Sequence, residues 1–142
     1  MLGEYKHTID EKGRVAVPAK FRTNVQNGAI ITRGLDHCLF VFTMSEWESL
    51  VRKITALPLA QSGARAFSRL MLAGAADVEL DGQGRILIPE HLREYAGLSK
   101  HAVVAGVYSR MEIWDSEKWT AYKTKTESDS DEIAEQLGAL GI

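Results

Sequence analysis

The sequence of 142 residues predicts a mainly β protein with flanking helices, folded as a β-barrel or sandwich with an internal pseudo-two-fold axis. Two observations lead to this prediction. One block of sequence occurs twice, and both copies contain short segments in which apolar and polar residues alternate. Such alternation is typical of strands that bury one face. A duplicated set of strands predicts two similar halves that pack against each other.

The repeat is clearest in two blocks of thirteen residues, Asp10–Arg22 and Asp81–Arg93, which are offset by 71 positions. Five positions are identical, and all of them hold Gly, Pro or a charged residue: Asp10 and Asp81, Gly13 and Gly84, Arg14 and Arg85, Pro18 and Pro89, Arg22 and Arg93. Farther on, Trp47 corresponds to Trp119 at an offset of 72. We therefore expect a first unit at residues 1–60, a connecting helix at 61–76, a second unit at 77–125, and an acidic linker with a short C-terminal helix at 126–142.

Each unit is expected to contain two strands joined by a turn, a short helix, two further strands and a helix. The predicted strands are Tyr5–Ile9, Val15–Val17, Ala29–Thr32 and Leu39–Thr43, with Ala102–Val107 and Met111–Trp114 in the second unit. Pro18 and Pro89 suit the first position of the short helices, and Gly97 suits the end of the second one. One such unit of roughly 50 residues is too small for a stable core, so the two units should bury each other's apolar strand faces.

Three helical segments are predicted outside the strands. Apolar residues at helical spacing from Trp47 to Leu57 predict an amphipathic helix with its N-cap at Thr43 or Ser45. A second helix is expected over Gln61–Ala76. The polar, acidic stretch Thr124–Asp131 predicts a flexible segment. After it, Ile133, Leu137 and Leu140 predict a short apolar helical stripe, for which a subunit contact is one candidate role.

The doubled turn, Asp10–Arg14 and Asp81–Arg85, carries the most chemistry. The Asp carboxylate can accept hydrogen bonds from N–H groups two and three residues on, and the Gly supplies a positive φ. The Arg is then held at a fixed place beside the turn. A rigid loop with Lys and Arg can hold phosphates, and an arginine can read guanine in a major groove. A turn whose Asp–Arg pair serves only geometry is the alternative interpretation.

Composition excludes several classes of protein. No segment approaches the roughly 18–20 apolar residues of a membrane span, so no membrane partner is expected. A single cysteine, Cys38, cannot form an internal disulfide, which favours a reducing, cytoplasmic setting. The net charge of −2 is unevenly distributed. Residues 112–142 hold three Lys and eight acids, a net charge of −5, so the remainder carries +3 and leaves room for a basic face.

The sequence indicates neither a cofactor nor an enzyme. The four histidines and Cys38 lack metal-ligand spacing, so no metal site is expected. No motif that activates a serine nucleophile is present. Gly82–Gly84 is not followed by a helix, as a phosphate-binding loop would be. Cys38 is expected to be a small buried thiol, and Trp47, Trp114 and Trp119 are expected to pack in a core or interface.

The chain resembles the MraZ family of bacterial proteins over about residues 1–122. The resemblance rests on the two Asp-x-x-x-Arg motifs, each followed by aliphatic residues and Pro, and on four further segments: Ser45–Trp47, Gly82–Ile88, Leu92–Leu98 and Met111–Trp114. It implies that each half is of the AbrB-like (SpoVT-AbrB) swapped-hairpin type, so the expected fold becomes a tandem swapped-hairpin barrel.

The resemblance further implies a sequence-specific DNA-binding transcriptional regulator, a repressor, located in the cytoplasm at the nucleoid. It would bind double-stranded DNA at short repeated boxes upstream of its own division and cell-wall gene cluster, as a ring-like homo-oligomer. The implied DNA-binding residues are Lys12, Gly13 and Arg14, with Gln83, Gly84 and Arg85 as a weaker set, while Asp10 and Asp81 shape the loops. Arg22 and Arg93 are expected to be mainly structural. A protein of another class, an oligomeric protein-interaction module with purely architectural turns, is the alternative.

Overall fold

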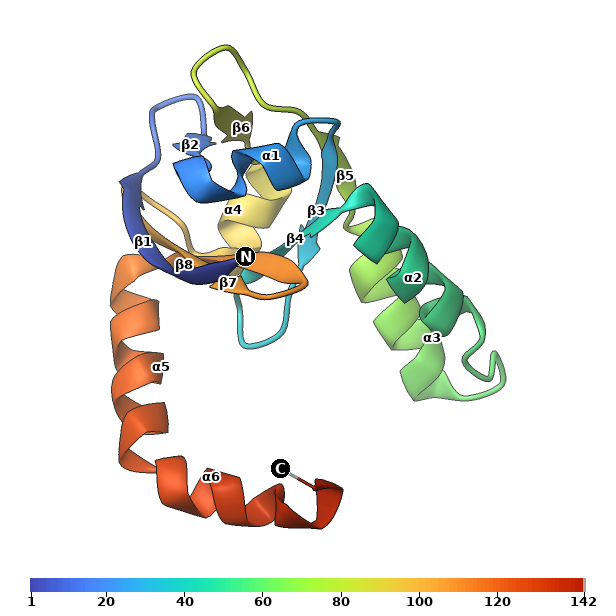
Figure 1. Cartoon of the computed structure of the whole chain (residues 1–142). Coiled ribbons are helices and arrows are strands. Elements are labelled where there is room, and N and C mark those ends of the chain that lie inside the picture. Colours follow the sequence, from blue (N-terminus) through green and yellow to red (C-terminus); the bar gives the residue numbers. More distant parts are fainter. Residues whose placement is uncertain (142) are drawn as a thin grey trace.

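A six-stranded antiparallel sheet and a separate two-stranded ribbon form the centre of the computed structural model, which describes residues 1–141 (Figure 1). The sheet has the strand order β1-β7-β8-β4-β3-β5. Its strands are β1 (Leu2–Thr8), β3 (Ala29–Arg33), β4 (Leu39–Thr43), β5 (Ala76–Val78), β7 (His101–Val107) and β8 (Arg110–Asp115). The ribbon consists of β2 (Arg14–Ala16) and β6 (Arg85–Leu87).

The two copies of the repeat exchange strands throughout this arrangement. β1 pairs with β7, β5 with β3 and β2 with β6, so each of these pairs joins one copy to the other. The hairpins β3–β4 and β7–β8 meet through β4 and β8. When every strand is replaced by its counterpart in the other copy, the same strand order is obtained, read from the opposite edge of the sheet. The fold therefore has the predicted internal pseudo-two-fold and the predicted mainly β character.

The predicted closed barrel is wrong, because the sheet is open. β1 and β5 lie at its two edges and do not pair with each other. Closure is not needed to cover apolar surface, since the ribbon and two short helices pack on one face of the sheet. The core on that face includes Val15, Ile86, Ile31, Val41 and Ile113.

Helices cover both faces of the sheet. α1 (Arg22–Val25), preceded by a 3₁₀ turn at Ala19–Phe21, and α4 (Glu90–Ala96) lie on the ribbon side. α2 (Met44–Thr55), α3 (Ser62–Ser68) and α5 (Ser116–Ser128) contribute to a second core on the other face, around Phe40, Phe42 and Trp114. Along β4, alternate side chains therefore enter different cores, as the period of a strand requires.

The helix ends follow local chemistry. Pro18 and Pro89 immediately precede the two short helical segments, and Gly97 ends α4 with the left-handed φ of 62°. The Thr43 hydroxyl accepts a hydrogen bond of 3.3 Å from the Glu46 N–H, which confirms Thr43 as the N-cap of α2. The helix predicted over Gln61–Ala76 is shorter, because α3 passes into a π-helical turn at Arg69–Ala73 and Ala76 begins β5.

The C-terminal arm differs from its prediction. α5 continues to Ser128, and α6 (Ser130–Gln136) follows after a break at Asp129, ending in a 3₁₀ turn at Gly138–Leu140. Most of Thr124–Asp131 is thus helical, whereas the sequence predicts a flexible segment there. This stretch contains neither Gly nor Pro, and the Asp115 carboxylate caps α5 by accepting from the Lys118 N–H. Within residues 1–141, no helix has both the length and the apolar character needed to cross a bilayer.

The ribbon should contribute to stability through one face only. We expect Ile86→Ala to lower the free energy of unfolding by about 2–5 kcal/mol, because Ile86 is buried and its truncation leaves a cavity. Leu87→Ala is the matched control, since Leu87 is 54% exposed and should change stability by no more than about 0.5 kcal/mol. Urea unfolding of both variants measures the difference. Equal destabilisation would contradict the orientation of the ribbon.

Candidate nucleic-acid interface

The two Asp-x-x-Gly-Arg loops have the same hydrogen bonds. In the first loop, Asp10 Oδ1 accepts from the backbone N–H groups of Lys12 at 3.0 Å and Arg14 at 2.9 Å. Asp10 Oδ2 accepts from Arg14 Nε at 2.7 Å. In the second loop, Asp81 Oδ1 accepts from the N–H groups of Gln83 and Arg85, both at 2.9 Å, and Oδ2 accepts from Arg85 Nε at 2.9 Å.

Each aspartate thus fixes its loop and its arginine together. The N–H groups that it binds lie two and four residues on, whereas two and three were expected. The N–H of the intervening glycine donates instead to the backbone carbonyl of the aspartate, at 3.0 Å in both loops.

The glycines adopt the predicted left-handed conformation but are not at the surface. Gly13 has a φ of 88° and Gly84 a φ of 76°. Both are buried. Each glycine carbonyl accepts a hydrogen bond from the other copy, Gly13 from the Ile88 N–H and Gly84 from the Val17 N–H, both at 2.9 Å. These two residues therefore shape the loops from inside the protein.

The ribbon brings the two arginines onto one outward face. Val15 pairs with Ile86 and both point into the core, so their neighbours Arg14, Ala16, Arg85 and Leu87 share the opposite face. Arg14 is 32% exposed and Arg85 26% exposed, measured on their side chains. Arg85 Nη1 lies 3.6 Å from Asp10 Oδ2, which places the two loops side by side. Both arginine side chains are thus partly exposed to solvent.

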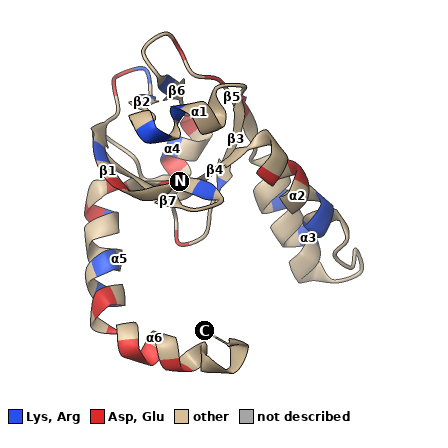
Figure 2. Cartoon of the chain, viewed as in Figure 1, with Lys and Arg blue, Asp and Glu red and all other residues tan. Residues whose placement is uncertain are grey.

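The remaining loop residues stand at the tips. Lys12 and Gln83 are exposed, and both loops project at the end of the molecule opposite the two helical arms (Figure 1). Figure 2 shows blue segments at β2, β6 and α1 around this end, with red segments in the two loops beside them, whereas α6 carries red segments. The cations of the ribbon end, among them Lys12, Arg14 and Arg85, thus stand beside the acids Asp10, Glu11 and Asp81.

The hydrogen bonds also favour the ionised form of the two aspartates. The backbone N–H of Arg14, aided by its guanidinium, holds the pKa of Asp10 below its usual value, and Arg85 does the same for the pKa of Asp81. A pKa lowered in the folded state means that the ionised carboxylate stabilises folding above the ordinary range of aspartate, about pH 4. That stabilisation is lost as the pH falls through the folded pKa.

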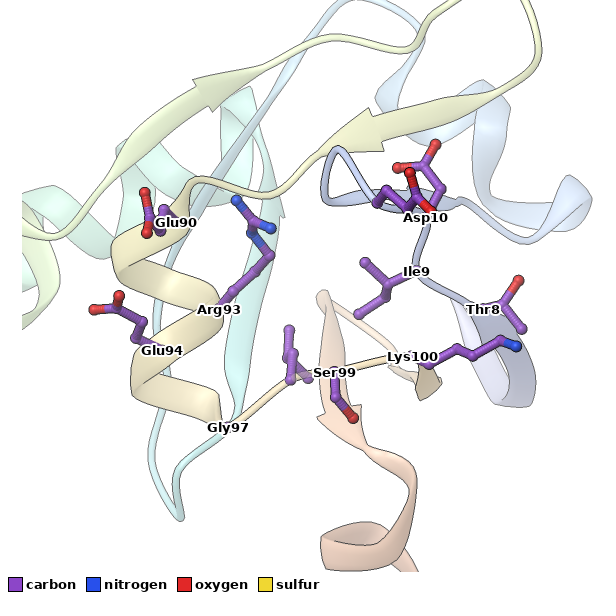
Figure 3. Close-up of a pocket in the computed structure, with 11 residues that line it drawn as sticks. Thr8, Ile9, Asp10, Glu90, Arg93, Glu94, Gly97, Ser99 and Lys100 are labelled. Atoms are coloured by element: carbon purple, nitrogen blue, oxygen red, sulfur yellow. The ribbon is translucent and has the colours of Figure 1, made fainter.

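A cleft of about 990 Å³ lies beside the first loop, between it and α4 (Figure 3). Its charged lining consists of Asp10, Glu11, Glu90, Glu94, Arg93 and Lys100. Four acids against two bases make the cleft unfavourable for phosphate groups.

The other candidates from the sequence have structural surroundings. Cys38 is buried, as predicted, and its Sγ donates to the Leu35 carbonyl at 3.2 Å. Burial raises the pKa of this thiol, so it is not a reactive thiolate. The tryptophans belong to the second core, as expected. Among residues 1–141 there is no group of three His, Cys, Asp or Glu side chains that could hold a metal ion.

The pairing of Asp10 with Arg14 can be checked by titration. We expect Arg14→Ala to raise the pKa of Asp10 part of the way to its ordinary value, because the guanidinium is lost while the backbone N–H of residue 14 remains. The pKa of Asp81 should stay unchanged, as should both values in the Arg52→Ala control. Carboxyl-carbon NMR measures these values. An unchanged pKa of Asp10 in the Arg14→Ala variant would contradict the ion pair between Asp10 and Arg14.

Comparison with known proteins agrees with this duplicated architecture. The family model described as "MraZ protein, putative antitoxin-like" matches the chain twice, at residues 1–70 and 71–139. A relative from Natranaerobius thermophilus named "Transcriptional regulator MraZ" is 52% identical, over 96% of this chain and 95% of its own length. A relative of the same name from Caldanaerobacter subterraneus subsp. tengcongensis is 49% identical, over 100% of this chain and 99% of its own. By its sequence and by its doubled loop unit, the chain belongs to the MraZ family.

Proposed function

We propose that this protein is a transcriptional regulator that binds double-stranded DNA in a sequence-specific way and acts as a repressor. The observation that carries the proposal is the outward β2–β6 ribbon, which presents Arg14 and Arg85 on one exposed face. A two-stranded ribbon fits the major groove of B-DNA, and arginine is the commonest reader of guanine there. The names of the relatives, which describe a regulator and not an enzyme, support the same function.

Each loop residue has a separate role in the proposal. Arg14 and Arg85 read base edges, while Lys12 and Gln83 at the loop tips contact phosphates or bases. Asp10 and Asp81 engage Nε of the arginines, which leaves both terminal nitrogens of Arg14 and Nη2 of Arg85 for the DNA, while Arg85 Nη1 lies 3.6 Å from Asp10 Oδ2. Gly13 and Gly84, being buried, shape the loops and do not touch the DNA.

The first loop is expected to contribute more than the second. Arg14 shares its charge with one carboxylate, that of Asp10. Arg85 faces two, Asp81 at 2.9 Å and Asp10 at 3.6 Å. The first tip also carries Lys12 where the second has the uncharged Gln83. The first tip also has Glu11 where the second has Gly82, so the two loops carry the same net charge, and the first differs by offering a second cation, Lys12, to the DNA.

A chain with a net charge of −2 and a small basic face should bind one site weakly. We propose that it forms a ring-like homo-oligomer whose protomers bind several short boxes upstream of its own gene cluster, at the nucleoid in the cytoplasm. Linked sites convert later contacts into intramolecular ones, and avidity then adds roughly 10²–10⁴ to the affinity. The exchange of β1 and β5 between the copies supports an AbrB-like swapped-hairpin type for units at residues 1–60 and 77–125.

The direct test is an electrophoretic shift of the DNA upstream of the protein's own gene, with scrambled DNA of equal length as competitor. Retention of the upstream DNA against excess scrambled DNA is the expected result. Equal competition by the upstream and the scrambled DNA would show that the binding is nonspecific. No shift at all would favour the alternative, a protein-interaction module with architectural turns.

Arginine substitutions separate the two loops. We expect Arg14→Ala to weaken binding to the upstream DNA at least about fivefold, since one specific arginine contact contributes about 1–3 kcal/mol. Arg85→Ala should weaken it less. Fluorescence anisotropy measures both affinities, with circular dichroism and sedimentation to show that folding and assembly persist. Unchanged affinity in a folded Arg14→Ala variant would show that Arg14 is not part of the interface with DNA.

Salt dependence tests the role of Lys12. Binding should weaken as salt rises, because neutralised phosphates release counterions. Lys12→Gln gives the first loop the residue of the second, and we expect the slope of log affinity against log salt to become shallower by about 0.9 per binding loop. Lys53→Gln, on α2 away from the ribbon, is the control and should keep the slope. An unchanged slope in Lys12→Gln would place Lys12 away from phosphate.

A further inference from the structure

We propose that Arg93 and Arg22 are positioning residues that act across the two copies. Arg93, on the helix of the second copy, holds the first DNA-binding loop in place, and Arg22, after the 3₁₀ turn of the first copy, holds the second loop. This inference rests on the proposed function for its effect on DNA. Its structural part concerns the loops alone and can be tested without DNA.

The contact between arginine and glycine is the first observation. A methyl group on Gly13 would lie 2.7 Å from Arg93 Cζ, and one on Gly84 would lie 2.5 Å from Arg22 Cζ. Each guanidinium therefore lies directly against the glycine of the opposite loop. This cover explains why both glycines are buried although their loops project from the molecule. Figure 3 shows Arg93 extending from α4 toward the first loop.

Backbone hydrogen bonds strengthen the same cross-copy connection. The Ile88 N–H, just before α4, donates to the Gly13 carbonyl, and the Val17 N–H donates to the Gly84 carbonyl. Arg22 Nε donates to the Val17 carbonyl at 2.9 Å, so one residue joins Arg22 to the second loop. A strand end and a helical side chain of one copy thus hold each loop of the other copy from below.

Arg93 differs from Arg22 in one respect. Its Nε is buried and has no hydrogen-bond partner among residues 1–141. An unpaired buried donor costs free energy, so stability alone would favour an apolar side chain at this position. We therefore assign the role of Arg93 to the contact that its guanidinium makes with the loop that carries Lys12 and Arg14.

Hydrogen exchange tests the structural part. In Arg93→Met, which keeps an unbranched side chain as far as the position of Nε but removes the rest of the guanidinium, we expect the amides of Lys12 and Arg14 to exchange at least about tenfold faster, because they depend on the Asp10 geometry. The amides of Gln83 and Arg85 should stay within about twofold. Arg22→Met should give the reverse pattern. Unchanged exchange in the opposite loop, or faster exchange in both loops of each variant, would overturn the proposal.

DNA binding tests the functional part. Arg93→Met should weaken binding to the upstream DNA about tenfold, while Arg52→Met, which removes the same charge from an exposed part of α2, should stay within about twofold. The loss should be less than additive with Arg14→Ala, because residues that act through the same loop couple. Arg93→Lys should remain impaired, since an ammonium lacks the planar surface of a guanidinium.

A direct phosphate contact by Arg93 is the competing explanation, and salt dependence decides between the two. Because Arg93 holds the loop that carries Lys12, the comparison is made in the Lys12→Gln background: there a positioning residue leaves the salt slope unchanged in Arg93→Met, whereas loss of a phosphate contact by Arg93 still reduces it by about 0.9. A reduced slope, or unchanged affinity in Arg93→Met, would overturn the positioning role. If the wild-type protein failed to bind the upstream DNA, the proposed function would fail, while the exchange pattern would still decide whether the arginines act across the copies.

Discussion

The antiparallel pairing of β2 with β6 is the interaction on which the rest of the structure depends. Its three residue pairs join the two copies of the repeat, bury Val15 and Ile86, and leave Arg14 and Arg85 on the outer face. Each strand alone is too short to hold a side chain in a fixed direction. The ribbon is rigid because its inner face belongs to a core that both copies build. The inner face of the ribbon thus contributes to stability, and its outer face carries the candidate site.

Much of this site could be predicted from the sequence, because its chemistry is local. The Asp-to-Arg spacing predicts a carboxylate-bound turn, Gly13 and Gly84 predict a positive φ, and Val15–Val17 predicts a strand. The partner of that strand could not be predicted in the same way. Antiparallel pairing of β2 with its own β1 or with β6 satisfies the same alternation of residues, and the choice depends on contacts more than 60 positions apart in the sequence.

The departures of the structure from the prediction have separate causes. A closed barrel follows from two similar strand sets if each set is complete, but β5 has only three residues where β1 has seven. The C-terminal stretch Thr124–Asp131 has a composition typical of flexible segments, yet Asp115 begins a helix that passes through most of it. The buried state of the glycines also needed the fold, since their cover comes from Arg22 and Arg93 of the opposite copies.

Fusion of the two copies in one chain allows the loops to differ while the scaffold remains symmetric. A symmetric dimer of one unit would carry identical loops, with the same charge at both tips. Here the first tip has Glu11 and Lys12, the second Gly82 and Gln83, and Asp10 contacts both arginines. Backbone hydrogen bonds of the same length, from the Ile88 N–H to Gly13 and from the Val17 N–H to Gly84, nevertheless hold both loops. Because each loop is supported by the other copy, such differences alter what a loop presents without removing what holds it.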